Sequence, residues 1–445
     1  MKLRDYQQDL YVKTVDAFRK GYKRPLVVAP CGAGKSYLFS EMVHRTDGEV
    51  LILVHRQELK QQHEQLLSDL GITNARVSMI LTEANRLGQY EKPSLIVADE
   101  AHLSRSNSWV KVIEYYDTFT VGLTATPIRL DGKPLGDIFD TLITGVDVKW
   151  LIENKRLAPY EYYAPTVVDT SGLRKIAGDY VVSDLEQLMN ERAIYGNVIE
   201  SYLRFAPGEK SIAYCVSVTH ARLTADSFNN AGIRAEVVSA GTPSKRRAEI
   251  MDDFRNGNLT ILCNVGIIAE GLSIDEVSVV MILRATESTA LGIQMMMRCM
   301  RYLPGKTAKI LDFVGNYTRG PGLPDTEHEW SLDKPCLNKQ ALDKNGNFYI
   351  RCCPECFMTF ATTDTCPFCG HTYPLHPREI QAHEEIELKR ISEEEAARIE
   401  AEKKKSRQQQ GRAQSYEELI KLGRSRGYKN PAYWAAQVMR GRKRK

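Results

Sequence analysis

The sequence predicts an α/β protein in which two parallel-sheet domains are followed by a small cysteine-rich module and a basic helical tail. Over roughly the first three hundred residues, short apolar runs alternate with amphipathic stretches, which is typical of βαβ units. The alternation stops after Gly315, where a Gly/Pro-rich stretch begins. Five cysteines then gather between Cys352 and Cys369, and these need an explanation of their own.

Composition and charge limit the possible function classes. With 445 residues, 43% hydrophobic and 26% charged, the chain is expected to form several soluble globular domains. It has no run of eighteen apolar residues, so we expect no membrane span. The polar start predicts no signal peptide and a cytoplasmic location. The tail Gly411–Lys445 holds ten Lys or Arg against two Glu, so an anionic polymer is sought there first.

Two sets of buried strands are predicted from short runs rich in Val, Ile and Leu. Ligands of such sheets bind at the carboxyl ends of the strands. A helix is expected at Gln57–Leu70, between strands of the first set. The first set comprises residues 24–30, 49–55, 93–100 and 118–127, and the second comprises 211–218, 233–240, 259–266, 277–286 and 308–315.

The expected domain boundaries follow from these patterns. Ser415 and Glu418 form a capping box that predicts a helix in the tail, and Asn430 and Pro431 predict the start of a second one. The predicted parts are a first domain 1–155, a connection 156–195, a second domain 196–320, a cysteine module 335–375, a charged helix or linker 376–411 and a basic helical tail 412–445.

A phosphate-binding loop is predicted at "APCGAGKS", residues 29–36, between a strand and a helix. Gly32, Ala33 and Gly34 would direct backbone N–H groups at phosphates, and the start of the helix adds its positive end. Lys35 would reach the β- and γ-phosphates, and the hydroxyl of Ser36 would ligate Mg²⁺. The alternative is an ordinary Gly-rich turn.

Two carboxylates end the next strong strand, in "VADEAH". Asp99 is predicted to hold Mg²⁺, directly or through water, and Glu100 to activate the attacking water. The alternative is a polar strand end. Together with the phosphate loop, this pair predicts ATP and Mg²⁺ as ligands.

The spacing Cys-x₂-Cys-x₉-Cys-x₂-Cys predicts a structural zinc site. Its predicted ligands are Cys353, Cys356, Cys366 and Cys369, and Cys352 competes with Cys353. His371 is a weaker candidate. A redox role for "CPEC" is the alternative, but no thioredoxin pattern surrounds it.

With these motifs in order, residues 1–315 resemble the superfamily 2 helicases. The resemblance rests on "LRDYQQ", "LVHRQELKQQ", "DEAH", "LTATP", "NVGIIAEGLSID" and "QMMMRCMR". It implies two RecA-like domains with ATP between them. It also implies roles for single residues. Gln7 would read adenine, and Gly271 and Gln294 would also contact the nucleotide. Nucleic-acid or coupling roles would fall to Arg56, His102, Thr124 and Thr126, and Arg298 and Arg301 would lie near the γ-phosphate.

Within the superfamily the chain is most similar to the RadD-like bacterial and phage group, on "VVMILRATES" and "YLPGKTAKILDFVGN". That resemblance also implies a zinc-ribbon-like module after the second domain. Four positions depart from the family pattern: Ala29 in the phosphate loop, Gln57 in the strand-contacting element, Ser273 in the fifth motif and Met297, where the sixth motif has glycine.

The resemblance implies an ATP-dependent helicase or translocase, with DNA favoured over RNA, no membrane and no specified protein partner. An ATP-switched binding or remodelling factor without processive unwinding is the alternative, and the motor of a restriction system ranks third. The arginines of "QMMMRCMR" have an alternative too: on spacing alone they could pair with nearby acids at a helix edge.

Overall fold

The computed structural model divides into two compact units, Met1–Pro374 and Leu375–Lys445, which are described separately. The residues that it describes are 2–103, 107–129, 134–164, 175–176, 179–180, 194–266, 276–318, 321–333, 337–338, 350–352, 359–361, 365–366, 370–371, 413, 415–425, 431–432, 435 and 438–439. Among the helices in these ranges, none is long and apolar enough to cross a lipid bilayer.

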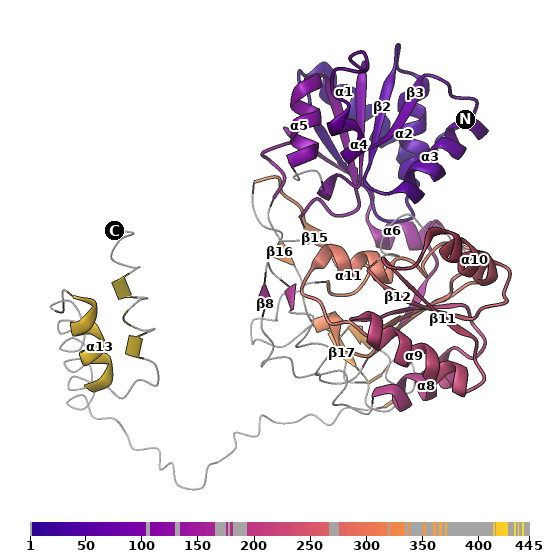
Figure 1. Cartoon of the computed structure of the whole chain (residues 1–445), viewed down its shortest axis with the longest axis vertical. Helices are drawn as coiled ribbons and strands as arrows, with labels where there is room; N and C mark the ends of the chain where they lie inside the picture. Colours follow the sequence, from indigo (N-terminus) through magenta and orange to yellow (C-terminus); the bar gives the residue numbers. More distant parts are fainter. Residues whose placement is uncertain are drawn as a thin grey trace, which may run out of the picture. The chain divides into compact units, whose positions relative to one another are not determined.

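The first domain is a six-stranded sheet in the order β3-β2-β4-β5-β1-β6, with every pairing parallel (Figure 1). Its elements are α1 (Asp5–Arg19), β1 (Pro25–Val28), α2 (Lys35–His44), β2 (Val50–Val54), α3 (Gln57–Asp69), β3 (Ala75–Met79), α4 (Ile80–Asn85), β4 (Leu95–Asp99), a 3₁₀ turn (Ala101–Leu103), α5 (Asn107–Tyr116), β5 (Phe119–Thr124), β6 (Thr141–Thr144) and α6 (Val148–Glu153).

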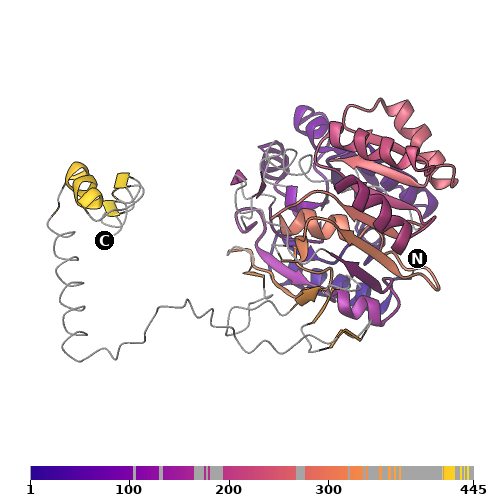
Figure 2. The ribbon, with the colours of Figure 1, turned by 90° about the horizontal axis from the view of Figure 1, so that it is seen from below.

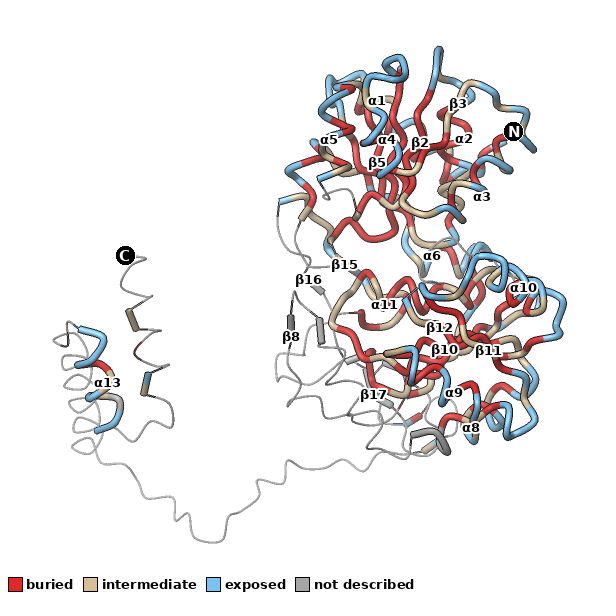
Figure 3. Tube along the Cα trace, viewed as in Figure 1, coloured by how far each residue is buried: buried red, intermediate tan, exposed pale blue. Residues whose placement is uncertain are grey.

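Helices cover both faces of this sheet, so its central strands are buried throughout (Figure 3). Successive side chains of a strand point to opposite faces. Val27 and Val97 pack with residues of α1, α2 and α3 in one cluster. Leu26 and Ile96 pack with residues of α4 and α5 in the other. Two buried faces explain why these strands are continuous apolar runs.

The second domain repeats the plan with the order β11-β12-β10-β13-β14-β7, again with only parallel pairings (Figure 2). Its elements are β7 (Tyr160–Tyr163), α8 (Ile194–Phe205), β10 (Ser211–Tyr214), α9 (Val218–Asn230), β11 (Ala235–Ser239), α10 (Ser244–Arg255), β12 (Ile261–Val265), β13 (Val279–Ile282), α11 (Thr289–Met296), β14 (Ala308–Asp312) and a 3₁₀ turn (Asn316–Thr318).

All nine predicted strands are present, and the predicted helix after β2 is α3. The sequence did not predict β3, β6 and β7, and each of these is an edge strand of its six-stranded sheet. β7 falls within the stretch expected to be a connection, yet it pairs with β14. The phenolic oxygen of its Tyr162 also donates to Asp312 Oδ2 at 2.7 Å. The second sheet therefore takes its edge strand from the stretch that leaves the first domain.

Short antiparallel hairpins follow the second domain. They pair β15 (His328–Glu329) with β16 (Leu337–Asn338) and β17 (Ile350–Cys352) with β18 (Thr359–Ala361). Another antiparallel pair, β8 (Lys175–Ile176) with β9 (Asp179–Tyr180), comes earlier in the chain, before α8. The charged segment expected at 376–411 lies outside the described residues.

The second unit contains α13 (Tyr416–Ser425). The predicted capping box is confirmed at its start. The amide of Glu418 donates to Ser415 Oγ at 3.1 Å, and the amide of Ser415 donates to Glu418 Oε2 at 3.3 Å. Tyr416 ties this helix to the next helical stretch by donating to the carbonyl of Ala432 at 3.0 Å. Asn430, its predicted cap, lies outside the described residues.

The centre of β5 leaves no room for a side chain at Gly122. A Cβ there would lie 2.5 Å from the Phe139 ring and 2.8 Å from Leu26 Cδ1. We therefore expect Gly122→Val to lower the free energy of unfolding by about 1–3 kcal/mol, measured by urea denaturation. Gly241→Ala is the control, because a Cβ there would lie 3.8 Å from its nearest neighbour, Ser239 Oγ. Equal stability of the two variants would contradict the packing of β5.

Candidate active site

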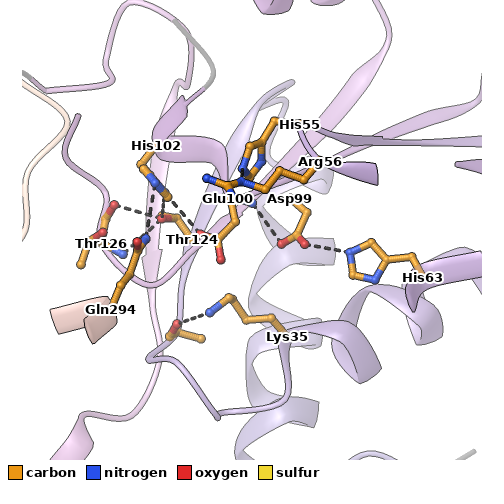
Figure 4. A network of polar contacts seen from close by, with 11 residues as sticks. Lys35, His55, Arg56, His63, Asp99, Glu100, His102, Thr124, Thr126 and Gln294 are labelled. Atoms are coloured by element: carbon orange, nitrogen blue, oxygen red, sulfur yellow. Dashed lines mark hydrogen bonds and ion pairs between the residues drawn. The ribbon is translucent and has the colours of Figure 1, made fainter. Parts of the chain in front are cut away.

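The site forms at the carboxyl edge of the first sheet, where β5 lies between β1 and β4. The register pairs Val28 with Thr124 and Asp99 with Leu123, so the three strands end side by side. The loops that follow them carry the phosphate loop, the acidic pair and the threonine pair. Figure 4 shows side chains of these loops converging on one place.

The phosphate loop has the backbone that its two glycines permit. Gly32 and Gly34 have φ angles of 82° and 81°, in the left-handed region that favours glycine. Gly34 is the N-cap of α2, so Lys35 and Ser36 open that helix at its positive end. Lys35 Nζ donates to the carbonyl of Ala29 at 3.2 Å and thus lies across its own loop.

Gln7 lies behind this loop, not beside open space. Its buried amide nitrogen donates to the carbonyls of Ala33 at 3.0 Å and Gly34 at 3.2 Å. Its amide oxygen accepts from the backbone N–H of Arg4 at 3.0 Å. Tyr6 adds a hydrogen bond from its hydroxyl to Ala33 at 3.1 Å. The amide expected to read adenine therefore holds the phosphate loop in this structure.

The acidic pair sits on a strained turn. Glu100 has a φ of 52°, which is uncommon for a residue with a Cβ. Its backbone N–H donates to Asp99 Oδ1 at 3.0 Å. Burial alone would raise the pKa of Asp99, but the hydrogen bond from His63 and the positive charge of Lys35 outweigh it and hold this pKa below the usual value. The same two groups therefore favour the charged form of Asp99.

The sequence did not single out His63, although its Nε2 lies 2.8 Å from Asp99 Oδ2 (Figure 4). One feature of the sequence could have indicated this buried histidine. Leu59, His63 and Leu67 are spaced one helical turn apart, and all three are buried on α3. A histidine within an apolar stripe needs a polar partner.

His102 connects the two domains. Its Nδ1 lies 3.3 Å from Glu100 Oε2 and 3.2 Å from Thr124 Oγ1. Its Nε2 lies 3.5 Å from the amide nitrogen of Gln294, which belongs to α11 of the second domain. Because the Gln294 amide nitrogen can only donate, His102 Nε2 must accept and Nδ1 must carry the proton. Thr124 Oγ1 also donates to the carbonyl of Thr126 at 2.9 Å.

Arg298 and Arg301 approach the phosphate loop from the second domain. The thiol of Cys31 in that loop has its pKa raised by burial, while the charges of Lys35, Arg298 and Arg301 act in the opposite direction. The backbone of Arg301 forms an antiparallel bridge with Leu157. A Cβ on Gly32 would lie 2.7 Å from Leu157 Cδ2, so this residue packs on the loop.

The methionines around these arginines are packing residues. Met295, Met296, Met297 and Met300 are all buried in the main core. Met297 is the C-cap of α11 with a φ of −67°, a conformation open to any residue. This backbone does not require the glycine of the family pattern.

Arg56 and the start of α3 reach the second domain as well. Arg56 Nη2 donates to the carbonyl of Gly266 at 3.2 Å. Glu58 of α3 forms an ion pair with Arg247 of α10. The element predicted to touch a nucleic-acid backbone therefore also spans the two domains. Gly271 and Ser273 lie outside the described residues.

Of the predicted zinc ligands, Cys366 is described, whereas Cys353, Cys356 and Cys369 are not. Cys366 is buried, and its N–H donates to the carbonyl of His371 at 2.8 Å. Within the described ranges no group of three or more His, Cys, Asp or Glu side chains could hold a metal ion. Three of the four thiols of the predicted zinc site lie outside those ranges, so the site stays a prediction.

The first-domain groups fit a magnesium–nucleoside triphosphate. The loop offers backbone donors, a helix start and Lys35 for phosphates. Ser36 and Asp99 offer the hard oxygen ligands that Mg²⁺ prefers. Glu100 lies beside them with a carboxylate that can accept a proton.

Family comparisons agree with this geometry. Residues 1–87 and 72–129 match the model of the type III restriction enzyme res subunit, and residues 195–303 match that of the helicase conserved C-terminal domain. A 51.5 kDa protein of a Lactococcus phage is 37% identical over 376 residues, covering 83% of this chain and 82% of its own length.

More distant relatives carry functional names. The putative ATP-dependent helicase IRC3 of Saccharomyces cerevisiae is 28% identical, and the match covers 70% of this chain and 51% of the yeast protein. The DNA 3′-5′ helicase XPB of Mycobacterium tuberculosis is 25% identical, with 59% and 51% covered. The chain thus spans about half the length of these two proteins.

A solved structure supports the fold. A fragment of a putative HsdR subunit of a type I restriction enzyme from Vibrio vulnificus superposes with a TM-score of 0.57 at 19% identity, covering 72% of this chain and 66% of the fragment. The tandem parallel sheets, the loops that meet at their edges and the matched families identify the chain as a member of the superfamily 2 helicases, an enzyme that hydrolyses ATP and acts on nucleic acid.

Proposed function

We propose that this protein couples ATP hydrolysis to movement along, or unwinding of, DNA. The observation that carries the proposal is geometric: the backbone of Arg301 in the second domain forms a bridge with Leu157, and the side chain of Leu157 packs on Gly32 of the phosphate loop. A guanidinium near the γ-phosphate stabilises the charge that develops during transfer. Hydrolysis then depends on domain closure, and closure moves a strand held across both domains.

The proposed roles follow the contacts. Lys35 and the loop N–H groups bind the phosphates, Ser36 and Asp99 hold Mg²⁺, and Glu100 accepts the proton of the attacking water. A magnesium ion bound there would neutralise phosphate charge. His102 and Gln294 would transmit the state of the nucleotide from one domain to the other, because they form a contact between the first and the second domain. Thr124 and Thr126 share that network.

DNA is proposed as the strand because the mycobacterial relative is named a DNA helicase. The ten Lys or Arg of Gly411–Lys445 supply positive charge for a phosphate backbone. Binding through phosphates should weaken steeply with salt and depend little on sequence. The RadD-like subgroup and the cytoplasmic location stay predictions.

A zinc module is proposed after the second domain. The register of the β17–β18 hairpin pairs Cys352 with Thr359, so Cys353 and Cys356 fall in the connection between the strands. The Cys366–His371 hydrogen bond closes a turn that includes Gly370 at a φ of 76°. The sequence holds one Cys-x-x-Cys pair after β17 and another that begins at Cys366, which is the pattern of a four-thiolate structural site.

Arg301→Ala should bind ATP with near-normal affinity but lose about 10²-fold or more of strand-stimulated turnover, because the lost group acts on the transition state. Turnover is measured with single-stranded DNA, duplex DNA, forked DNA and RNA side by side. Arg255→Ala is the control, since Arg255 pairs with Asp252 on the outside of α10. Wild-type turnover of Arg301→Ala would refute the arginine assignment.

The same DNA and RNA substrates distinguish helicase activity from ATP-switched binding without unwinding. A strand-displacement assay on the forked DNA should release the strand only when ATP is hydrolysed. ATPase activity with no displacement at any fork length would favour a remodelling factor. Stimulation by RNA alone would overturn the choice of DNA.

Gln7→Glu should weaken nucleotide binding about tenfold, because it replaces the donor to two buried carbonyls with a carboxylate oxygen. Affinities for ATP and GTP are measured by calorimetry. Gln8→Glu is the matched control one residue along. If Gln7 acts through the loop, both nucleotides lose affinity; loss for ATP alone would show that its amide reads the base instead.

Purified protein should carry about one zinc ion per chain. Cys366→Ser should lose it, because three thiolates hold zinc less tightly than four, whereas Cys263→Ala in β12 should retain it. Elemental analysis by mass spectrometry gives the stoichiometry. Wild-type protein without zinc would refute the module.

A further inference from the structure

His63 occupies a place on α3 where an apolar side chain would suffice for packing. It is only 1% exposed and lies one turn from Leu59 and one turn from Leu67, both buried. The edge of its ring packs against Phe39 of α2, with the ring centroids 4.8 Å apart. The imidazole is therefore fixed between two helices and the end of β4.

The contact with Asp99 is a single directed hydrogen bond. His63 Nε2 lies 2.8 Å from Asp99 Oδ2. Its other nitrogen, Nδ1, is buried and has no hydrogen-bond partner among the described residues. A proton on Nδ1 would leave a buried donor unsatisfied, which costs more than an unshared lone pair. His63 therefore donates from Nε2, and Asp99 accepts.

Two donors thus fix the plane of the Asp99 carboxylate. Oδ2 accepts from His63, and Oδ1 accepts from the backbone N–H of Glu100 at 3.0 Å. Each carboxylate oxygen has two lone-pair directions, so each keeps one for a cation or its water. Without His63, only the Glu100 amide would restrain rotation of this carboxylate.

We propose that His63 is a positioning residue that aims the Asp99 carboxylate at the magnesium ion of the bound nucleotide. This inference rests on the proposed role of Asp99 as a magnesium ligand. Partners that orient a ligating carboxylate typically change metal affinity 10–100-fold when removed. The histidine itself does not touch nucleotide, so its effect passes through Asp99.

Two substitutions separate orientation from packing. His63→Leu keeps an apolar body of similar size but removes the donor. His63→Gln places an amide N–H where Nε2 stood and can donate to the same oxygen. We measure the Mg²⁺ concentration that gives half-maximal binding of a fluorescent ATP analogue, with the same titration repeated for ATPase activity.

His63→Leu should raise the half-maximal Mg²⁺ concentration about tenfold or more, and His63→Gln should restore most of that loss. Binding of the analogue in EDTA should be unchanged in both. Leu67→Ala is the control on the same face of α3, expected to lower the melting temperature and leave the Mg²⁺ midpoint unchanged. An unchanged midpoint in His63→Leu, or equal shifts in the Leu and Gln variants, would overturn the proposal.

The Asp99→Asn variant shows whether a negative result means that His63 has no positioning role or that Asp99 does not hold magnesium. If Asp99→Asn shifts the Mg²⁺ midpoint and His63→Leu does not, Asp99 holds the metal and His63 has no positioning role. If Asp99→Asn leaves the midpoint unchanged, the metal assignment itself is wrong, and the proposal for His63 falls with it.

Discussion

The parallel pairing of β5 between β1 and β4 is the constraint on which the site depends. Parallel strands end at a common edge, so the pairing itself brings together the loops that follow these three strands. Burial on both faces fixes the register, because a slip by one residue would exchange the two faces of a strand. Phe139 and Leu26 also restrict the position of β5, because both side chains lie close to Gly122.

Polar contacts between the domains differ in length. His102 reaches Gln294 at the limit of hydrogen-bond length, whereas the Glu58–Arg247 ion pair joins α3 to α10 more closely. A long contact between buried groups is sensitive to small displacements, since hydrogen-bond strength falls steeply with geometry. His102 is therefore well placed to respond to domain movement.

Sequence patterns predicted the parts of this structure that depend on local chemistry. Central strands such as β2 and β13 are continuous apolar runs that are buried throughout, because helices cover both faces of each sheet. β3, β6 and β7 were missed, since strands near a sheet edge are partly exposed and mixed in composition. The motifs located the phosphate loop and Asp99, but the partners of Gln7 and His63 depend on how distant helices pack, which no single motif encodes.

The packing around Arg298 and Arg301 explains how domain movement can become a change in charge at the nucleotide. Buried methionines on both sides anchor this segment in the core of the second domain. Close-packed interiors transmit displacement with little deformation, so the arginines move as part of that domain. The bridge between Arg301 and Leu157 binds the same segment to the chain that leaves the first domain. Met297 therefore packs within the buried support of these two arginines.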